Sequence, residues 1–210
     1  MKTGKVLFTT IVLGLALVLS ACVSKQEKEV KIKKDMKADK VHVAVLVTEG
    51  FHDGEAYMPI GYLYNRGARV TVIGPETGKV TAYNSDFTIK IQKAISEVSV
   101  DDFDALILPG GHAPAKLREN EEVVAFTKAF FETNKTTAAI CHGPQVLVTA
   151  GVLDGLKSTS FPGIKDEMKK AGVLFEDAAL VVDGNLITSR VPDDLSQFCR
   201  AIGKALFKDT

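Results

Sequence analysis

The chain has 210 residues, of which 46% are hydrophobic and 25% are charged, with 26 basic and 26 acidic side chains. This is the composition of one ordinary globular domain, and it excludes a fibrous or a disordered protein. Nine of the lysines lie in residues 1–40, so residues 41–210 hold 17 basic and 22 acidic side chains and lack the basic surface that nucleic-acid binding needs.

The N-terminus resembles a bacterial lipoprotein signal. Lys2 and Lys5 precede the apolar run 6–19, and the small residues 20–21 lead directly into Cys22. We therefore predict cleavage before Cys22, lipidation of its thiol, and a mature chain that is lipid-anchored in the cell envelope, on the outer side of the cytoplasmic membrane or on a periplasm-facing membrane. An uncleaved signal anchor is the alternative, although the apolar run is short for a membrane-spanning helix.

Residues 23–40 alternate lysine with acidic residues and contain no aromatic side chain. Such a segment buries too little apolar surface to offset the entropy of ordering, so we predict a solvated tether. The sequence therefore divides into a signal peptide (1–21), a lipidated cysteine with a charged tether (22–40) and one domain (41–210).

From residue 41 onward, strand-like and helix-like segments alternate. β-Branched apolar runs predict buried parallel strands at 41–47, 105–108 and 137–140, with a further strand at 69–73. Apolar residues at helical spacing predict helices around 123–131 and 195–206, and 181–187 is typical of a hairpin that turns at Asp183-Gly184. The alternation predicts a single α/β domain with a doubly wound parallel sheet.

Reactive groups in such folds lie at the carboxyl ends of the strands. Three loops at these ends are rich in glycine and histidine, namely 48–55, 109–114 and 141–144. In the third, a strand runs directly into Cys141 and then into a helix, which is the setting of a nucleophile elbow. The helix N-terminus favours a thiolate there, and the backbone amides of His142 and Gly111, next to Gly110, are placed to form an oxyanion hole.

Four motifs in the domain resemble those of the ThiJ/PfpI family. They are Leu-Pro-Gly-Gly-His-Ala-Pro at 108–114, Ala-Ile-Cys-His-Gly-Pro-Gln at 139–145, Ser-Phe-Pro-Gly-Ile-Lys-Asp at 160–166 and Ser-Arg-Val-Pro-Asp-Asp-Leu at 189–195. The resemblance covers 41–210 and is to the PfpI-like branch. It implies a flavodoxin-like, class I glutamine-amidotransferase-like fold, assembly into homo-dimers or higher homo-oligomers, and a reactive cysteine that acts on glyoxals or their adducts. Peptidase activity is also claimed for this branch.

The positions of the histidines limit the possible bases. No histidine follows His142, so a triad with its histidine far downstream of Cys141 cannot be assembled within this chain. The candidates are His142, His52 and His112, whereas His42 lies inside the first predicted strand and is expected to be structural.

The string Phe51-His52-Asp53-Gly54-Glu55 departs from the PfpI-like pattern Phe-Glu-Asp-x-Glu, whose first Glu is taken to contact the cysteine. We therefore expect His52 to replace that carboxylate. Asp53 and Glu55 are expected to stabilise the N-terminus of the next helix, and Glu49 falls outside the family position.

Two further departures concern the walls of the site. Ala115 stands where the branch carries a Glu that reaches a neighbouring subunit's histidine, and Phe161 stands where relatives carry Tyr or His. We expect His142 to lack an orienting acid. Phe161 and His112 are expected to line the substrate site, where Phe161 offers the substrate no polar contact.

The sequence indicates neither a metal site nor a second reactive thiol. Cys141 with His52, His112 and His142 could supply metal ligands, but their spacing matches no standard metal motif, so we expect no metal and no cofactor. Cys199 lies on the apolar face of the last predicted helix and is expected to be a core thiol.

Three functions agree with these residues. As an enzyme, the chain would add Cys141 to the carbonyl of a small dicarbonyl such as methylglyoxal, with His52 or His142 moving protons, and would release a hydroxy acid or repair glycated groups. A non-catalytic envelope protein is the alternative, either a redox sensor through a Cys141 sulfenate or a chaperone-like module. The third is a PfpI-type peptidase that needs an oligomer.

Overall fold

The computed structural model describes residues 41–207. The predicted signal peptide, Cys22 and tether lie outside the described residues. Among residues 41–207, no helix is long and apolar enough to cross a membrane.

A seven-stranded sheet forms the centre of the domain, in the order β10-β11-β7-β6-β1-β2-β5. Every strand except β10 runs parallel to its neighbours, and β10 pairs antiparallel with β11 at one edge. The strands are β1 (His42–Leu46), β2 (Arg69–Gly74), β5 (Lys93–Ala94), β6 (Ala105–Leu108), β7 (Thr136–Ile140), β10 (Leu180–Asp183) and β11 (Leu186–Ser189).

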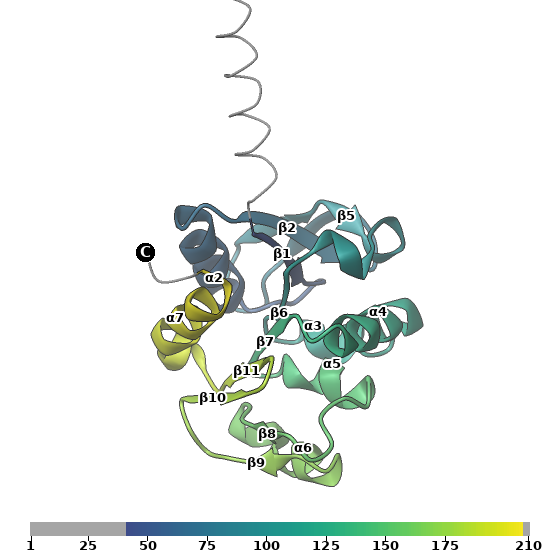
Figure 1. Cartoon of the computed structure of the whole chain (residues 1–210). Helices are drawn as coiled ribbons and strands as arrows, with labels where there is room; N and C mark the ends of the chain where they lie inside the picture. Colours follow the sequence, from purple (N-terminus) through teal and green to yellow (C-terminus); the bar gives the residue numbers. More distant parts are fainter. Residues whose placement is uncertain (1–40, 208–210) are drawn as a thin grey trace, which may run out of the picture. The chain divides into compact units, whose positions relative to one another are not determined.

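Helices cover both faces of this sheet (Figure 1). On one side α2 (Asp53–Asn65) packs against α7 (Leu195–Leu206), and on the other lie α3 (Ala113–Leu117), α4 (Glu121–Glu132) and α5 (Pro144–Thr149). All residues of β1 and of β6 are buried, as expected for parallel strands that are covered on both faces. The predicted flavodoxin-like α/β fold with one domain is confirmed.

Smaller elements surround the sheet. Two short sheets pair β3 (Gly78–Thr81) with β4 (Thr88–Ile91) and β8 (Lys157–Ser158) with β9 (Leu174–Phe175). Helix α6 (Lys165–Lys170) and the 3-10 turns η1 (Ile95–Glu97), η2 (Val100–Asp102), η3 (Pro162–Ile164) and η4 (Pro192–Asp194) complete the described chain. The predicted hairpin at 181–187 is β10–β11, with Asp183 paired to Leu186 across the turn.

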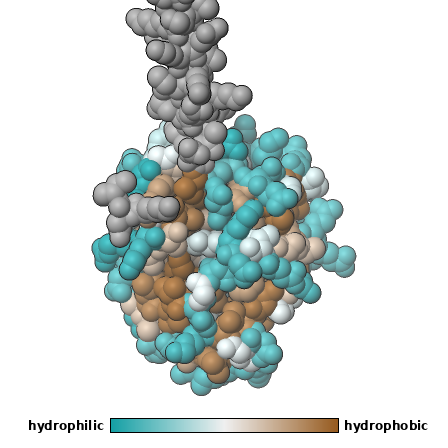
Figure 2. Space-filling view, viewed as in Figure 1, coloured by the Kyte–Doolittle hydropathy of each residue, from teal (hydrophilic) through white to brown (hydrophobic). Residues whose placement is uncertain are grey.

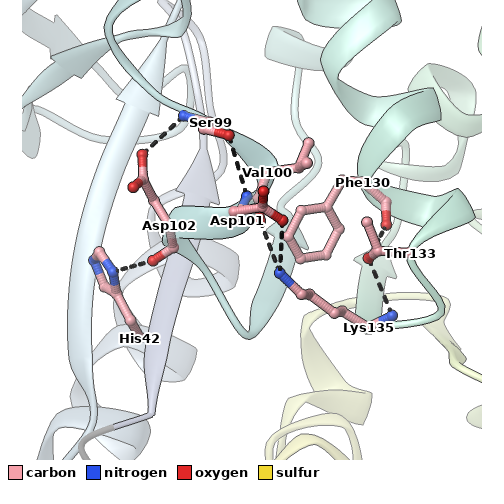
Figure 3. Close-up of polar contacts among 8 residues, drawn as sticks. All are labelled: His42, Ser99, Val100, Asp101, Asp102, Phe130, Thr133 and Lys135. Atoms are coloured by element: carbon pink, nitrogen blue, oxygen red, sulfur yellow. Dashed lines mark hydrogen bonds and ion pairs between the residues drawn. The ribbon is translucent and has the colours of Figure 1, made fainter. Parts of the chain in front are cut away.

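His42 holds the amino-terminal end of the sheet together, which agrees with the structural role predicted for it. Its ring contacts the backbone carbonyl of Asp102 (Figure 3). The other ring nitrogen lies 2.8 Å from the hydroxyl of Thr71. Nearby, the Lys135 ammonium donates to the Val100 carbonyl at 3.0 Å and lies 5.9 Å from the centre of the Phe130 ring. These contacts lie at the end of the sheet opposite to Cys141.

Candidate active site

Cys141 lies at the junction between β7 and α5, in a backbone conformation that is rare for a residue with a side chain. Its φ angle is 62°, in the left-handed region. The conformation is held because the Cys141 amide donates to Ser189 at 3.1 Å and its carbonyl accepts from the Phe161 amide at 2.9 Å. The side chain is 7% exposed. The predicted strand–turn–helix elbow is therefore present at Cys141, with a strained backbone of the kind found at functional sites.

The glycines of two loops let the backbone approach the cysteine closely. A Cβ atom added to Gly143 would lie 2.1 Å from the Leu108 carbonyl oxygen, and one added to Gly110 would lie 2.7 Å from the Cβ of Cys141. Gly111 has a φ angle of 85°. The amides of Gly111 and His142 lie close enough to the Cys141 sulfur to lower the pKa of the thiol. These are the two amides that the sequence predicted for an oxyanion hole.

Glu55 lies beside the thiol, so two expectations from the sequence are wrong. Its side chain is fully buried, its Oε2 accepts from the Gly110 amide at 2.8 Å, and it lies close enough to Cys141 to shift the pKa of the thiol. Glu55 therefore does not serve the helix N-terminus, and the acid partner of the cysteine is not missing. The cause is the geometry of α2, whose first turn directs Glu55 inward to the carboxyl ends of β6 and β7.

Burial and charge couple Glu55 to Cys141. Burial raises the pKa of Glu55 to about 7, against the opposing hydrogen bond from the Gly110 amide. Burial raises the pKa of the Cys141 thiol to about 12, and the negative charge of Glu55 adds to this rise, whereas the two amides lower it. Because two neighbouring acids resist ionising together, the pair retains one proton and one negative charge at pH values above the pKa of Glu55.

The His142 imidazole contacts the Cys141 sulfur directly. Its Nδ1 lies 3.2 Å from the Cys141 sulfur, and its ring stacks on Phe161 with 4.8 Å between centroids. Burial lowers the pKa of His142, nearby His112 lowers it further and Glu167 raises it. A neutral imidazole in contact with the thiol is suited to accept its proton.

His142 was expected to lack an orienting acid; the charge of Glu167 raises its pKa, but the direct contacts of Glu167 are with other residues. One carboxylate oxygen accepts from Gln145 at 2.8 Å and the other pairs with Arg118. Glu167 therefore acts on His142 through charge, not through a hydrogen bond.

His52 has no hydrogen bond to Cys141 among the described residues. Its ring packs edge-on against Tyr83 with 5.7 Å between centroids, and its Nδ1 lies 3.4 Å from an Asp53 oxygen. Burial lowers the pKa of His52. Its amide donates to the Gly110 carbonyl at 3.1 Å, so the residue helps to fix the glycine loop. A role for its imidazole as a base stays a prediction.

Tyr83 is a site residue that the sequence did not indicate. It follows β3, donates its amide to the Phe51 carbonyl at 3.0 Å, and packs on His112 with 4.3 Å between ring centroids. Burial raises the pKa of Tyr83, and the charges of Cys141 and Glu55 add to the rise. No motif marks Tyr83, because only the docking of the β3–β4 hairpin on the loop at 50–53 brings it to the site.

Two remaining features are the possible metal ligands and the second thiol, Cys199. Within residues 41–207, no cluster of three or more His, Cys, Asp or Glu side chains is arranged to hold a metal ion. Cys199 is a free thiol buried in α7, in agreement with the core position predicted for it.

Comparisons with known proteins identify the domain. The model of the DJ-1/PfpI family matches residues 41–205. A deglycase of Pyrococcus abyssi is 45% identical over 166 residues, which are 79% of this chain and 99% of the relative. Protein/nucleic acid deglycase 2 of Escherichia coli is 42% identical over 160 residues, 75% of this chain and 93% of that protein.

Solved structures agree with these relatives. DJ-1beta of Drosophila melanogaster matches with a TM-score of 0.74 and 30% identity, over 80% of this chain and 90% of that chain. A two-domain protein of Anabaena variabilis, with DJ-1/ThiJ/PfpI-like and ferritin-like domains, matches with a TM-score of 0.78 and 39% identity. That match covers 80% of this chain but 48% of the two-domain protein.

Proposed function

The chain belongs to the DJ-1/PfpI family, and from this premise we propose that it is a cysteine-dependent enzyme of the deglycase or glyoxalase type. Its substrates would be small dicarbonyls such as methylglyoxal, or groups that these compounds have glycated. Relatives named as deglycases support the reaction class. The observation that carries the proposal is the Cys141 sulfur, which lies 3.2 Å from the His142 imidazole and has a pKa that the nearby Glu55 and two backbone amides shift.

In the proposed reaction, the Cys141 thiol loses its proton to His142 or Glu55, and the sulfur attacks the aldehyde carbon. The carbonyl oxygen takes the electron pair, accepts hydrogen bonds from the amides of Gly111 and His142, and is then protonated to give a hemithioacetal. A proton moves from the aldehyde carbon to the neighbouring carbon through an enediol, which leaves a thioester. Water hydrolyses the thioester to lactate and regenerates the thiol, so methylglyoxal and one water become lactic acid.

A glycated amine would follow the same route with one difference. The adduct carries the amine on the former aldehyde carbon, so the amine leaves when the sulfur bonds to that carbon. The sum is adduct plus water giving free amine plus lactic acid. Glu55, with a pKa raised to about 7, can both give and accept a proton at neutral pH.

Residues 41–210 are suited to assays in solution. The described core lies within 41–207, and the Pyrococcus abyssi relative aligns over 99% of its own length with this part of the chain. The segment therefore corresponds to a whole natural protein and can be expected to fold on its own.

The test supplies methylglyoxal to residues 41–210 and measures lactate, because any thiol can trap methylglyoxal without forming lactate. We expect turnover in the unaltered domain and in Cys199→Ala, and none in Cys141→Ala. His142→Ala and His52→Ala then test each of these two histidines as the base. A folded domain that forms no lactate from methylglyoxal or from a glycated amine would contradict the proposal and favour the redox-sensor or chaperone-like function. Peptide cleavage by the assembled oligomer would instead favour a peptidase.

We also propose that the full chain is a lipoprotein of the cell envelope and forms homo-oligomers. The lysines, apolar run and small residues before Cys22 support the first part, and the family resemblance supports the second. Bacteria that express the full chain should incorporate an alkynyl fatty acid into it, and Cys22→Ala should abolish this label while Cys199→Ala retains it. An unlabelled chain would overturn the anchor, and a monomer in sedimentation would overturn the oligomer.

A further inference from the structure

A concave site that does not include Cys141 lies between α7 and the β10–β11 hairpin. It is a groove of about 700 Å³, lined by one side of α7, by both strands of the hairpin and by Thr136, the first residue of β7. Cys141 follows the opposite end of β7, so the groove is separate from the candidate active site. Its volume lies within the range of about 300–1,000 Å³ that is typical of small-molecule sites.

The floor of the groove is apolar. Leu180 and Val182 alternate along β10 and therefore share a face of the sheet, and Val182 is paired in register with Ile187 of β11. Val182 is 54% exposed, although it is a large apolar side chain. In Figure 2, apolar surface is visible at the lower left, where Figure 1 places α7 and the hairpin.

The shape of the groove follows from the sequence of α7. The residues that line it are Gln197, Arg200, Ala201, Lys204 and Ala205, which form one stripe along the helix. Ala201 and Ala205 lie one turn apart, and their short side chains leave the space between the helix and β10 unfilled. A larger side chain at either position would occupy the groove.

The rim of the groove is positively charged. Arg200 and Lys204 lie one helical turn apart, and neither makes an ion pair with another residue of the described part of the chain. The one side-chain hydrogen bond of Arg200 there goes to the Ser196 hydroxyl, at 2.6 Å. No acidic residue belongs to the lining. Two like charges at this spacing repel one another, so an anion between them would be stabilising.

We propose that this groove binds a single-chain amphiphile with an anionic head, of the class of a fatty-acid carboxylate. The alkyl chain lies on Leu180, Val182 and Ile187, and the carboxylate lies between Arg200 and Lys204. The apolar floor and the unpaired cations at one rim together match such a ligand better than they match an uncharged or a cationic one. The site is independent of the proposed chemistry at Cys141.

The test is calorimetric titration of residues 41–210 with dodecanoate below its micelle concentration. Octanoate should bind more weakly, because fewer methylene groups are buried. Dodecyltrimethylammonium should bind at least about tenfold more weakly than dodecanoate, because its charge has the wrong sign. Equal affinity for the two head groups would overturn the proposal, as would the absence of dodecanoate binding.

Substitutions at residues of the groove test whether dodecanoate binds there. Ala201→Trp should fill the groove and abolish binding, and Arg200→Gln with Lys204→Gln should weaken it at least about tenfold. The matched control is Lys128→Gln, on the exposed side of α4, which should bind as the unaltered domain does. Val182→Glu, at an exposed position, gives a second loss of binding if Ala201→Trp fails to fold. Unchanged binding in a folded Ala201→Trp or Val182→Glu variant would overturn the proposal.

A second copy of the chain is the other possible occupant, because β10 is an edge strand. If the unaltered domain is a dimer that does not bind dodecanoate, and Ala201→Trp makes it monomeric, the groove is an interface between copies and the proposal is wrong.

Discussion

At the scale of single residues, the chemistry depends on how Cys141 and Glu55 share a proton. Burial and the charge of Glu55 favour a neutral thiol, while two nearby backbone amides favour a thiolate. When Glu55 is protonated, its charge no longer opposes the thiolate and its O–H can donate to the sulfur. A single proton transfer between the two side chains would therefore activate the nucleophile without bringing a second charge into the site.

Glu55→Gln should separate the reactivity of the thiol from turnover. Glutamine carries no charge, so the pKa of Cys141 should fall and the thiol should be alkylated faster by iodoacetamide at a given pH below that pKa. Lactate formation should nevertheless fall by about a hundredfold, because the proton donor and acceptor is lost. The measurements are the pH dependence of alkylation and the turnover of methylglyoxal.

The control for this variant is Glu132→Gln, an exposed residue of α4 that should change neither rate. Slower alkylation together with lower turnover would point to a structural defect and contradict the proton-sharing role of Glu55.

The site residues were predicted to different extents, and the difference has a physical cause. Cys141, His142 and the two glycines follow buried strands directly, so their place in the chain also fixes their place in space. Glu55 was assigned to the wrong role because the direction of a side chain in the first turn of a helix depends on how the helix lies on the sheet. Tyr83 reaches the site only because the β3–β4 hairpin packs on the loop at 50–53, and a contact between distant segments leaves no local sequence pattern.

At the scale of elements, the elbow between β7 and α5 depends on the close approach of backbones. Gly143 has no room for a side chain, because the Leu108 carbonyl of the neighbouring β6 would lie 2.1 Å from its Cβ. The Gly143 amide donates to Ile140 at 2.8 Å, which closes the turn that contains Cys141. The position of the nucleophile and the packing of two strands are thus coupled.

Gly143→Ala should therefore lower the free energy of unfolding by about 3 kcal/mol, since a clash with backbone cannot be relieved by a rotamer change. The matched control is Gly61→Ala, within α2, where an added Cβ meets no atom within 4 Å. Gly61→Ala should raise the free energy of unfolding by about 0.5–1 kcal/mol, because alanine favours the helix. Urea unfolding of both variants tests the pair, and an equal effect would contradict this account.

Prediction of the elements succeeded where burial leaves a periodic pattern. The strands at 41–47, 105–108 and 137–140 and the helices at 123–131 and 195–206 correspond to β1, β6, β7, α4 and α7. The β3–β4 and β8–β9 pairs were not predicted, because most of their residues are partly exposed or exposed and their strands are short. The order of the strands depends on contacts between distant segments and does not follow from local pattern.

At the scale of the whole molecule, the buried Glu55 links catalysis to stability. Its pKa is raised from 4.5 to about 7 in the folded state. The folded protein therefore holds a proton that the unfolded chain has already lost between these values, and rising pH favours unfolding. Placing a proton donor next to the thiol thus destabilises the fold at neutral pH. Selection for activity would maintain Glu55 despite this loss of stability.

The free energy of unfolding of the unaltered domain should consequently fall relative to that of Glu55→Gln as pH rises from about 5 to about 8, by about 3 kcal/mol in total. His42, His52 and His142 have lowered pKa values and give a dependence of opposite sign, because they must be charged in the unfolded chain at low pH. Both proteins contain these histidines, so the difference between the two unfolding curves isolates Glu55. Urea unfolding at several pH values measures it, and a difference that stays constant with pH would show that Glu55 ionises normally in the folded state.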